Sequence, residues 1–299
     1  MDLYICIDVG GTFIKHGMVD AASSFAEIDE IPTEAHLGGA SVVNRMMEIV
    51  KRYINQYKIA GICISSAGVV DCKKGEILYA GSSLPGYTGI SVKKMMEEKF
   101  YLPCEIENDV NCAGLAEYFG GAAKGYSSMA CLTVGTGIGG SVIIDDKIVH
   151  GCFGSAGEVG YMYMGEGTFE ELASTRTLIQ RVALRKKCEI SDLDGKKIFK
   201  LAKNGDSICI HAIDEMTDIL GKGIANICFT VNPEVVVLGG GIMSQREYLY
   251  GKIRKCMDYY LHSLPQIAEH TKLAFAKHKN YSGMLGAYYH FRKMHGQQF

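Results

Sequence analysis

The chain has 299 residues, of which 47% are hydrophobic and 21% charged, and its formal net charge is −2. This length suffices for two domains with substantial cores, and the composition is ordinary for a soluble globular protein. A nearly neutral chain without a block of like charge lacks the basic face that nucleic-acid binding needs, so we expect no nucleic-acid partner.

Cysteine usage and hydropathy bear on the compartment. The 11 Cys lie singly, mostly within apolar segments, which is typical of reduced thiols in a cytoplasmic protein. No Cys-x-x-Cys pair occurs, which argues against a structural zinc. We find no signal peptide and no apolar stretch near the ~18 residues that span a bilayer, so we expect no membrane partner.

The apolar periodicity predicts two similar halves of an α/β fold. Strands are expected at residues 3–7, 13–19, 24–31, 59–65, 104–107, 129–134, 138–144 and 235–238. Helices are expected at residues 40–57, 92–100, 110–119, 168–187, 195–204, 206–231, 247–261 and 283–293. Both halves run strand, turn, strand, and then helix and strand, which predicts a boundary near residue 107 and a rough internal repeat.

A Gly/Thr turn follows the first expected strand. Because Gly lacks a Cβ atom, such a turn lets backbone N–H groups approach an anion closely. We expect Gly10, Gly11 and Thr12 to bind phosphate oxygens. Asp8 would hold Mg²⁺, directly or through water, and Lys15 would add positive charge. The alternative is a hairpin turn that binds nothing; the segment matches neither the Walker A pattern nor a helix-opening G-x-G-x-x-G.

Two further glycine turns follow apolar strands. The first contains Gly135, Thr136 and Gly137, and we expect it to bind phosphate as well. The second is the run Gly239-Gly240-Gly241, where an adenine or ribose could lie against the backbone. A tight turn without a ligand is the alternative for the triple glycine.

Asp109 lies at an expected strand-to-helix corner, directly after Asn108. A side chain at such a corner can project into a cleft and accept a proton from a sugar hydroxyl as that oxygen attacks the γ-phosphorus. The alternative is that Asp109 or Asn108 only caps the following helix.

Acidic residues near position 160 are candidates for sugar binding. Glu158 lies between two glycines, and a carboxylate there is costly to bury unless hydroxyls donate to it. Glu170 and Glu171 open an expected helix, where acids are also favoured by the helix dipole alone.

In chain order, these motifs resemble the ROK family of sugar kinases and repressors, within the actin-like ATPase and hexokinase superfamily. The resemblance covers nearly the whole chain and rests on residues 8–12, 65–68, 107–111, 135–140, 157–160 and 238–241. It implies two ribonuclease-H-like domains, each a mixed sheet flanked by helices, with a cleft between them. The smaller domain would comprise residues 1–107, joined by the C-terminal helix at about 283–295, and the larger one residues 108–282.

The resemblance also implies roles for individual residues. Asp109 matches the catalytic base, and Gly10, Gly11, Thr12, Thr136 and Gly137 match phosphate contacts. The matching substrate-binding positions are Ser66, Ala67, Gly68, Asn108, Asp109, Glu158, Tyr161 and Glu170. The family further implies a homodimer.

Two departures from the family pattern concern zinc. Many relatives carry a His that ligates zinc where this chain has Tyr161, and Thr168 stands where the last Cys of their zinc-binding run would be. We therefore expect no zinc and a resemblance to the branch that includes β-glucoside kinases and N-acetylmannosamine kinases. Residues 64–81 look closest to the latter, and residues 278–287 closer to the former.

The leading hypothesis is an enzyme that uses ATP and Mg²⁺ to phosphorylate the primary O6 hydroxyl of a hexose or hexose derivative, of the glucose, N-acetylmannosamine or β-glucoside type. One alternative is a sugar-responsive transcriptional regulator, which is disfavoured because the phosphate motif already begins at Asp8 and leaves no room for a helix-turn-helix segment. The other alternative is a sugar-binding protein without catalytic activity.

Overall fold

The computed structural model describes residues 2–297 and divides into two compact units. The first unit contains the chain up to Gly120, the segment His150–Ala156, and the chain from Asn280 onward. The second contains Gly121–Val149 and Gly157–Lys279. Each unit has its own hydrophobic core and its own five-stranded sheet.

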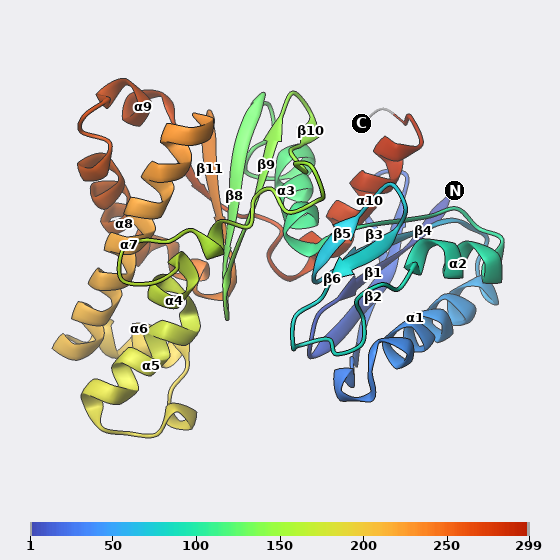
Figure 1. The fold of residues 1–299 in the computed structure, drawn as a ribbon, viewed down its shortest axis with the longest axis horizontal. Coiled ribbons are helices and arrows are strands. Elements are labelled where there is room, and N and C mark those ends of the chain that lie inside the picture. The colour runs from blue at the N-terminus through green and yellow to red at the C-terminus, as the bar shows by residue number, and fades with distance from the viewer. Residues whose placement is uncertain (1, 298–299) are drawn as a thin grey trace. The chain divides into compact units, whose positions relative to one another are not determined.

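The sheet of the first unit has the order β3-β2-β1-β4-β7, and Figure 1 labels its strands β1, β2, β3 and β4. The strands β1, β2 and β3 form an antiparallel meander, and β4 and β7 run parallel to β1. These strands are Leu3–Val9, Phe13–Asp20, Phe25–Pro32, Ile59–Ser66 and Cys104–Asn108. The remaining elements are the helices α1 (Gly39–Ile54), α2 (Val92–Phe100), α3 (Asp109–Gly120) and α10 (Ser282–Met294), and the hairpin of β5 (Val69–Asp71) and β6 (Glu76–Tyr79).

Helices α1 and α10 cover opposite faces of this sheet. Successive side chains of a strand point to opposite faces. In β1, Ile5 and Ile7 join the core that contains the buried side of α1, whereas Tyr4 contacts the rings of Tyr288 and Phe291 in α10. The central strands β1 and β4 are therefore buried on both faces, which explains their continuous apolar runs, whereas the edge strand β3 is largely exposed.

The second unit repeats this topology, with the sheet order β10-β9-β8-β11-β12. Strands β8, β9 and β10 are antiparallel, and β11 and β12 run parallel to β8. The strands are Ser128–Val134, Ile138–Ile144, Lys147–Ile148, Val235–Gly239 and Lys272–Phe275 in the order β8 to β12. The helices are α4 (Phe169–Ala173), α5 (Thr175–Lys186), α6 (Gly195–Lys203), α7 (Ser207–Val231), α8 (Arg246–Tyr260) and α9 (Pro265–His270).

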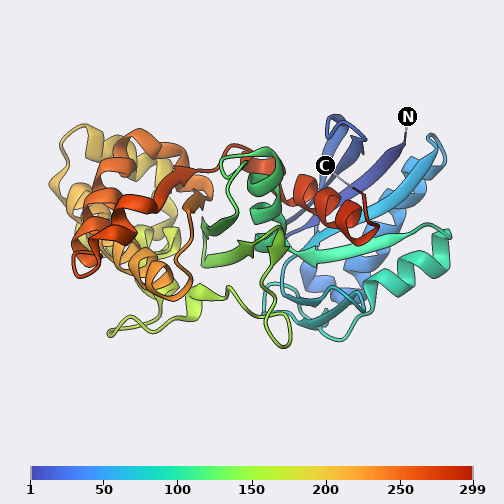
Figure 2. The ribbon, with the colours of Figure 1, turned by 90° about the horizontal axis from the view of Figure 1, so that it is seen from above.

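Helix α7 organises the core of the second unit. It packs on α4, α5, α6 and α8, and α7 and α8 lie side by side in Figure 1 and Figure 2. Gly221 permits this contact, since a Cβ atom there would lie 2.4 Å from Cys256 Cβ on α8. Although α7 spans 25 residues, neither it nor another helix in the described part of the chain combines the length and apolarity needed to cross a membrane.

The α/β class and most elements agree with the sequence predictions, but the structure differs from them at four points. The helix expected at 168–187 is two helices, because Ser174 adopts an extended conformation and caps α5 through the N–H of Thr177. The short elements β5–β6, β10, α9 and β12 were not predicted. The first unit extends past the expected boundary at 107 to Gly120, because α3 packs on α10. The segment His150–Ala156 also belongs to the first unit, although it lies within the range expected for the second.

Candidate functional site

In the first unit, three parallel strands end at one edge of the sheet. Val9 of β1 pairs with Ser66 of β4, and Ser66 pairs with Asn108 of β7. The segments that follow these three residues must therefore emerge side by side. Ligands of open α/β sheets bind at this carboxyl edge, and all of the predicted site residues of the first unit lie along it or one turn away.

The first glycine turn joins β1 to β2. The N–H of Gly10 donates to Phe13 O (3.0 Å), and Thr33 Oγ1 donates to Gly10 O (2.7 Å), so the backbone of Gly10 closes the turn. At Gly11 a larger residue would crowd the neighbouring loop, because a Cβ atom there would lie 3.1 Å from Ser83 Cβ. The N–H groups of Gly11 and Thr12 make no hydrogen bond within the described part of the chain. Of the three N–H groups in this turn, those of Gly11 and Thr12 are therefore available to a ligand and that of Gly10 is not.

The carboxylate of Asp8 lies beneath this turn. Ser65 Oγ donates to Asp8 Oδ1 at 2.7 Å, and a Cβ atom on Gly283 would lie 2.5 Å from the same oxygen. Burial raises the pKa of the Asp8 carboxyl, while the Ser65 hydrogen bond and the charge of Lys15 oppose that rise. Lys15 pairs with Asp8 across the β1–β2 ladder, and its Nζ donates to Asn280 O (3.3 Å).

Asn108 and Asp109 form the corner between β7 and α3, and Asn108 caps the helix. Its Oδ1 accepts from the N–H groups of Val110 (2.9 Å) and Asn111 (3.0 Å). Its Nδ2 donates to Asp109 Oδ1 (3.0 Å) and to Gly68 O (2.9 Å). Because Asn108 fills the capping position, capping alone does not account for the carboxylate of Asp109.

Ser66, at the end of β4, is buried, whereas Ala67 and Gly68, which follow it, are partly exposed. Ser66 is fully buried, and its hydroxyl donates to Ala67 O (3.1 Å) and to Tyr87 Oη (3.3 Å). Gly68 has φ = +102°, and a Cβ atom there would lie 2.5 Å from Tyr79 O, so only glycine fits. A substrate contact from this segment is therefore available from Ala67 or Gly68, and Ser66 belongs to the core.

Glu107, which we did not single out as a site residue, supports the corner from below. Its Oε1 accepts from Asn108 N (2.7 Å) and Asn111 Nδ2 (3.0 Å), and its Oε2 lies 2.6 Å from His150 Nε2. Burial alone would raise the pKa of Glu107, but the His150 hydrogen bond and the neighbouring His290 lower it. Hydrogen bonds to Cys72 and Glu107 raise the pKa of His150 to about 10. The sequence offered no local signal for this group, whose members come from four separate segments.

In the second unit, two glycine turns meet at the ends of adjacent parallel strands. Gly239 of β11 pairs with Thr133 of β8, so the runs 239–241 and 135–137 emerge side by side. The N–H of Gly135 donates to Gly137 O (2.9 Å) and closes its turn. Gly240 has φ = +103°, and a Cβ atom there would lie 2.2 Å from Val134 O. Glycine at 240 is thus required by the close approach of the two strand ends.

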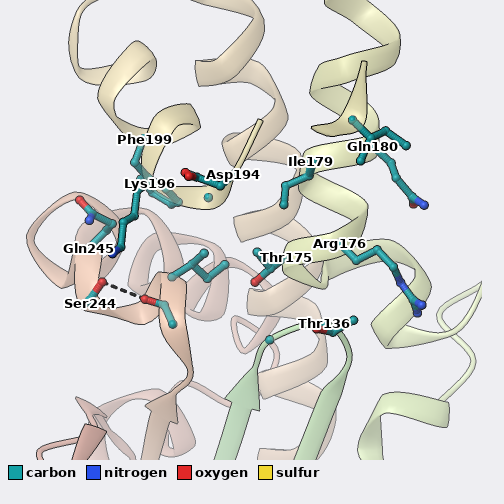
Figure 3. A pocket seen from close by; sticks show the side chains of 15 residues that line it. Thr136, Thr175, Arg176, Ile179, Gln180, Asp194, Lys196, Phe199, Ser244 and Gln245 are labelled. Atoms are coloured by element: carbon teal, nitrogen blue, oxygen red, sulfur yellow. Dashed lines mark hydrogen bonds between the residues drawn. The ribbon is translucent and has the colours of Figure 1, made fainter. Parts of the chain in front are cut away.

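A cavity of about 690 Å³ opens between these turns and the helices α5 and α6 (Figure 3). Ile179, Phe199 and Ile242 give it an apolar wall, and Thr136 lies at its β8–β9 end. Ser244 Oγ donates to Gly241 O (2.8 Å), which orders the loop on one side. The volume is within the range of small-molecule sites. The complete lining is Gly135, Thr136, Thr175, Arg176, Ile179, Gln180, Ile190, Asp194, Gly195, Lys196, Phe199, Gly241, Ile242, Ser244 and Gln245.

The acidic residues of the second unit have different surroundings. Glu171 and Thr168 form a capping box at the start of α4, so Glu171 is structural. Glu170 instead accepts from the N–H of Ile138 (3.3 Å), directly after the β8–β9 turn. Burial and the charge of Glu170 raise the pKa of Glu158. Tyr161 follows Glu158 on the same 3₁₀ turn and is 66% exposed.

Comparison with known proteins accounts for both the fold and these motifs. The family model described as "ROK family" matches residues 4–294. The chain belongs to the ROK family. An uncharacterized protein of Clostridium perfringens, CPE0188, is 47% identical over 98% of this chain and 99% of its own length. The β-glucoside kinase of Listeria innocua is 30% identical over 95% of each chain.

A solved ROK structure has the same fold. The glucokinase of Streptomyces griseus, determined in complex with glucose and AMPPNP, superposes with a TM-score of 0.83 at 26% identity, covering 95% of this chain and 97% of its own. The two similar sheets seen here are thus the paired domains of a ROK actin-like ATPase fold.

Proposed function

We propose that this ATP-dependent sugar kinase transfers the γ-phosphoryl group to the primary O6 hydroxyl of a hexose or hexose derivative, with Asp109 as general base. The observation that carries the proposal is the register of β1, β4 and β7, which brings the Gly11–Thr12 turn, Gly68 and Asp109 to one sheet edge. Asn108 orients the Asp109 carboxylate by donating to Oδ1. A proton from O6 would pass to Asp109 as the oxygen attacks phosphorus.

The nucleotide would bind to the second unit. The cavity between α5, α6 and the turns is large enough for an adenosine, and its apolar wall suits a purine ring. The N–H groups of Thr136 and Gly137 make no hydrogen bond within the described part of the chain, so they are available to phosphate oxygens. Gly241 would bring backbone close to the ribose, and Arg176 and Lys196 supply positive charge in the lining.

The residues around Asp8 fit a magnesium ion. The pKa of the half-buried Asp8 carboxyl is raised, so it lacks sufficient compensating charge, and a hard oxygen ligand suits Mg²⁺. When bound, the ion would neutralise charge on the phosphates. Asp8 would hold it directly or through water, and Ser65 keeps the carboxylate oriented.

Carboxylates and one amide would bind the sugar hydroxyls. Glu158 and Glu170 lie near one another in the second unit, where each can accept hydrogen bonds from vicinal hydroxyls. Asn108, Gly68 and Ala67 belong to the first unit, and exposed Tyr161 supplies an apolar ring. Such donor–acceptor patterns discriminate strongly between sugars, because a missing hydroxyl leaves a polar group unpaired. The candidates are glucose, N-acetylmannosamine and β-glucosides.

A sugar panel tests both the reaction and its position. ADP release is measured with ATP, Mg²⁺ and each of glucose, mannose, N-acetylmannosamine, N-acetylglucosamine and cellobiose. We expect one of these to be preferred, and the 6-deoxy analogue of that sugar to be inert. Phosphorylation of the 6-deoxy analogue would refute the O6 assignment, and the absence of turnover with every sugar would favour a non-catalytic sugar-binding protein. Sedimentation would test the expected homodimer.

A further inference from the structure

We propose that Cys72, Glu107 and His290 bind a divalent transition-metal ion, and that their donor set selects zinc. The three residues belong to the β5–β6 turn, the end of β7 and helix α10, all within the first unit. This site differs from the zinc site described above for many ROK relatives. The positions of that zinc site correspond in this chain to Tyr161 and Thr168, which lie in the second unit and are not the His and Cys of those relatives.

The three ligand atoms already lie close together. One atom from each of the three residues lies within 4.8 Å of the other two, and His290 Nδ1 is 3.6 Å from Glu107 Oε2. With zinc bonds of about 2.1 Å to N and O and about 2.3 Å to S, tetrahedral ligand atoms stand about 3.5 Å apart. Small side-chain rotations therefore suffice to close the site.

The donor chemistry matches zinc better than a hard cation. One sulfur, one imidazole nitrogen and one carboxylate oxygen are the three donor types that zinc takes in proteins, whereas Mg²⁺ and Ca²⁺ prefer oxygen alone. A thiolate and a carboxylate together balance the two charges of the ion. Three protein ligands leave a fourth position for water.

His290 supplies an independent indication. Its side chain is 5% exposed, and Nε2 is buried without a hydrogen-bond partner among the described residues. The other ring nitrogen lies 3.6 Å from Glu107, beyond ordinary hydrogen-bond distance. Nδ1 is the ring nitrogen that faces Glu107, and coordination to a metal would give this nitrogen the partner that the carboxylate at 3.6 Å does not supply.

His150 would act as a second layer around the ion. Its Nε2 lies 2.6 Å from Glu107 Oε2 and 3.6 Å from Cys72 Sγ, so it contacts two of the proposed ligands. Ligating carboxylates are commonly hydrogen-bonded in this way, which fixes their orientation.

The proposed ion would stabilise the corner that carries Asp109. Glu107 faces the cluster with Oε2, while its Oε1 accepts from Asn108 N. Glu107 is therefore a positioning residue, and metal at Oε2 would restrain the backbone before Asp109. This effect on turnover rests on the proposed function, whereas metal binding itself does not.

The test uses the full-length protein, stripped with a chelator and titrated with Co²⁺ and with Zn²⁺ alone. We expect one ion per chain, a thiolate-to-cobalt charge-transfer band, and displacement of Co²⁺ by Zn²⁺. Cys72→Ser should abolish the band and weaken binding at least tenfold, and His290→Gln should weaken binding comparably. Cys152→Ser is the matched control, because this exposed thiol lies outside the cluster and its loss should change neither readout.

Three results would overturn the proposal: no stoichiometric binding to the wild-type chain, unchanged binding by Cys72→Ser, or loss of the band in Cys152→Ser. Thermal melts of the stripped variants show whether each has folded. Since Cys72 lies at a half-buried turn, its replacement by Ser leaves the fold intact, and the cobalt band can be read even if His290→Gln is unstable. Binding without any effect on turnover would refute the positioning role of the ion alone, and a chain that binds zinc but phosphorylates no sugar would refute the proposed function alone.

Discussion

Replacing Asp109 by Asn isolates the proposed proton transfer from the structure of the corner. Asp109 Oδ1 accepts hydrogen bonds from Asn108 Nδ2 and Val110 N, at 3.0 and 2.9 Å. An Asn side chain keeps an acceptor oxygen in the same place, so both bonds persist in Asp109→Asn. What the amide cannot do is take up a proton from the sugar hydroxyl.

The expected effect follows from the usual contribution of a general base. Such a group accelerates the reaction about 10²–10⁴-fold, which corresponds to about 2.7–5.4 kcal/mol of transition-state stabilisation. We therefore expect the turnover number of Asp109→Asn to fall by that factor, while the nucleotide affinity and the melting temperature stay near wild type. The cavity that we assign to the adenosine lies wholly in the second unit, and the substitution leaves Asp8 and the N–H groups of Gly11 and Thr12 unchanged, so nucleotide affinity should change little.

Steady-state ADP release with the preferred sugar measures the rate, and calorimetric titration with a non-hydrolysable ATP analogue measures nucleotide binding. Asp20→Asn is the matched control, because Asp20 Oδ1 also accepts two hydrogen bonds, both from backbone N–H groups in a turn of the same unit. The reasoning fails if Asp109→Asn retains more than about a tenth of the wild-type turnover. A fall in melting temperature of Asp109→Asn without one in Asp20→Asn would instead assign Asp109 a structural role.

Three further predictions concern stability and the nucleotide cavity. Gly240→Ala should lower the free energy of unfolding, measured in urea, by at least about 2 kcal/mol, because φ is +103° and the new Cβ atom would meet Val134 O. In the control Gly241→Ala the new Cβ atom meets no atom within 4 Å, so its stability should be near that of the wild type. Equal effects of the two substitutions would contradict this reasoning. Burial and the charge of Arg52 lower the pKa of His16 from 6.5 to about 4 in the folded chain, so His16 takes up a proton in the unfolded chain first as the pH falls. The contribution of His16 to the free energy of unfolding is therefore complete above pH 6.5 and is lost as the pH falls to about 4. His16→Gln should flatten this part of the curve of unfolding free energy against pH. Ile179→Trp should raise the KM for ATP at least about tenfold, because the larger side chain would fill the cavity. The control Leu184→Trp, at a position of α5 that is 80% exposed, should leave the KM unchanged. Equal KM values for the two variants would mean that ATP binds elsewhere.

Much of the fold could be predicted because it is encoded locally. Apolar runs of β-branched residues and 3–4-residue spacing reflect the geometry of single strands and helices, and Gly/Thr turns reflect backbone conformations that other residues cannot adopt. The elements around Gly10, Gly135 and Gly240 were therefore predictable, as were the α/β class and the ROK resemblance, which the family match confirms.

Packing decided the roles that local pattern left open. Asn108 rather than Asp109 caps α3, because the carbonyl of Gly68 on the neighbouring strand end orients the Asn amide. The hydroxyl of Ser66 is buried against Tyr87, although its motif gave no reason to separate it from Gly68. Arg176 and Lys196 line the cavity without any sequence signal, since the fold of α5 and α6 alone brings them there.

By itself, the sequence determined which segments form strands and helices, where glycine is required and which family the chain resembles, because each depends on residues close together in the chain. Only the tertiary structure brought Cys72, Glu107, His150 and His290 together. Likewise, only the register of the sheet aligned the carboxyl ends of the strands β1, β4 and β7. Proximity between distant segments depends on how whole elements pack, and no local periodicity records that arrangement.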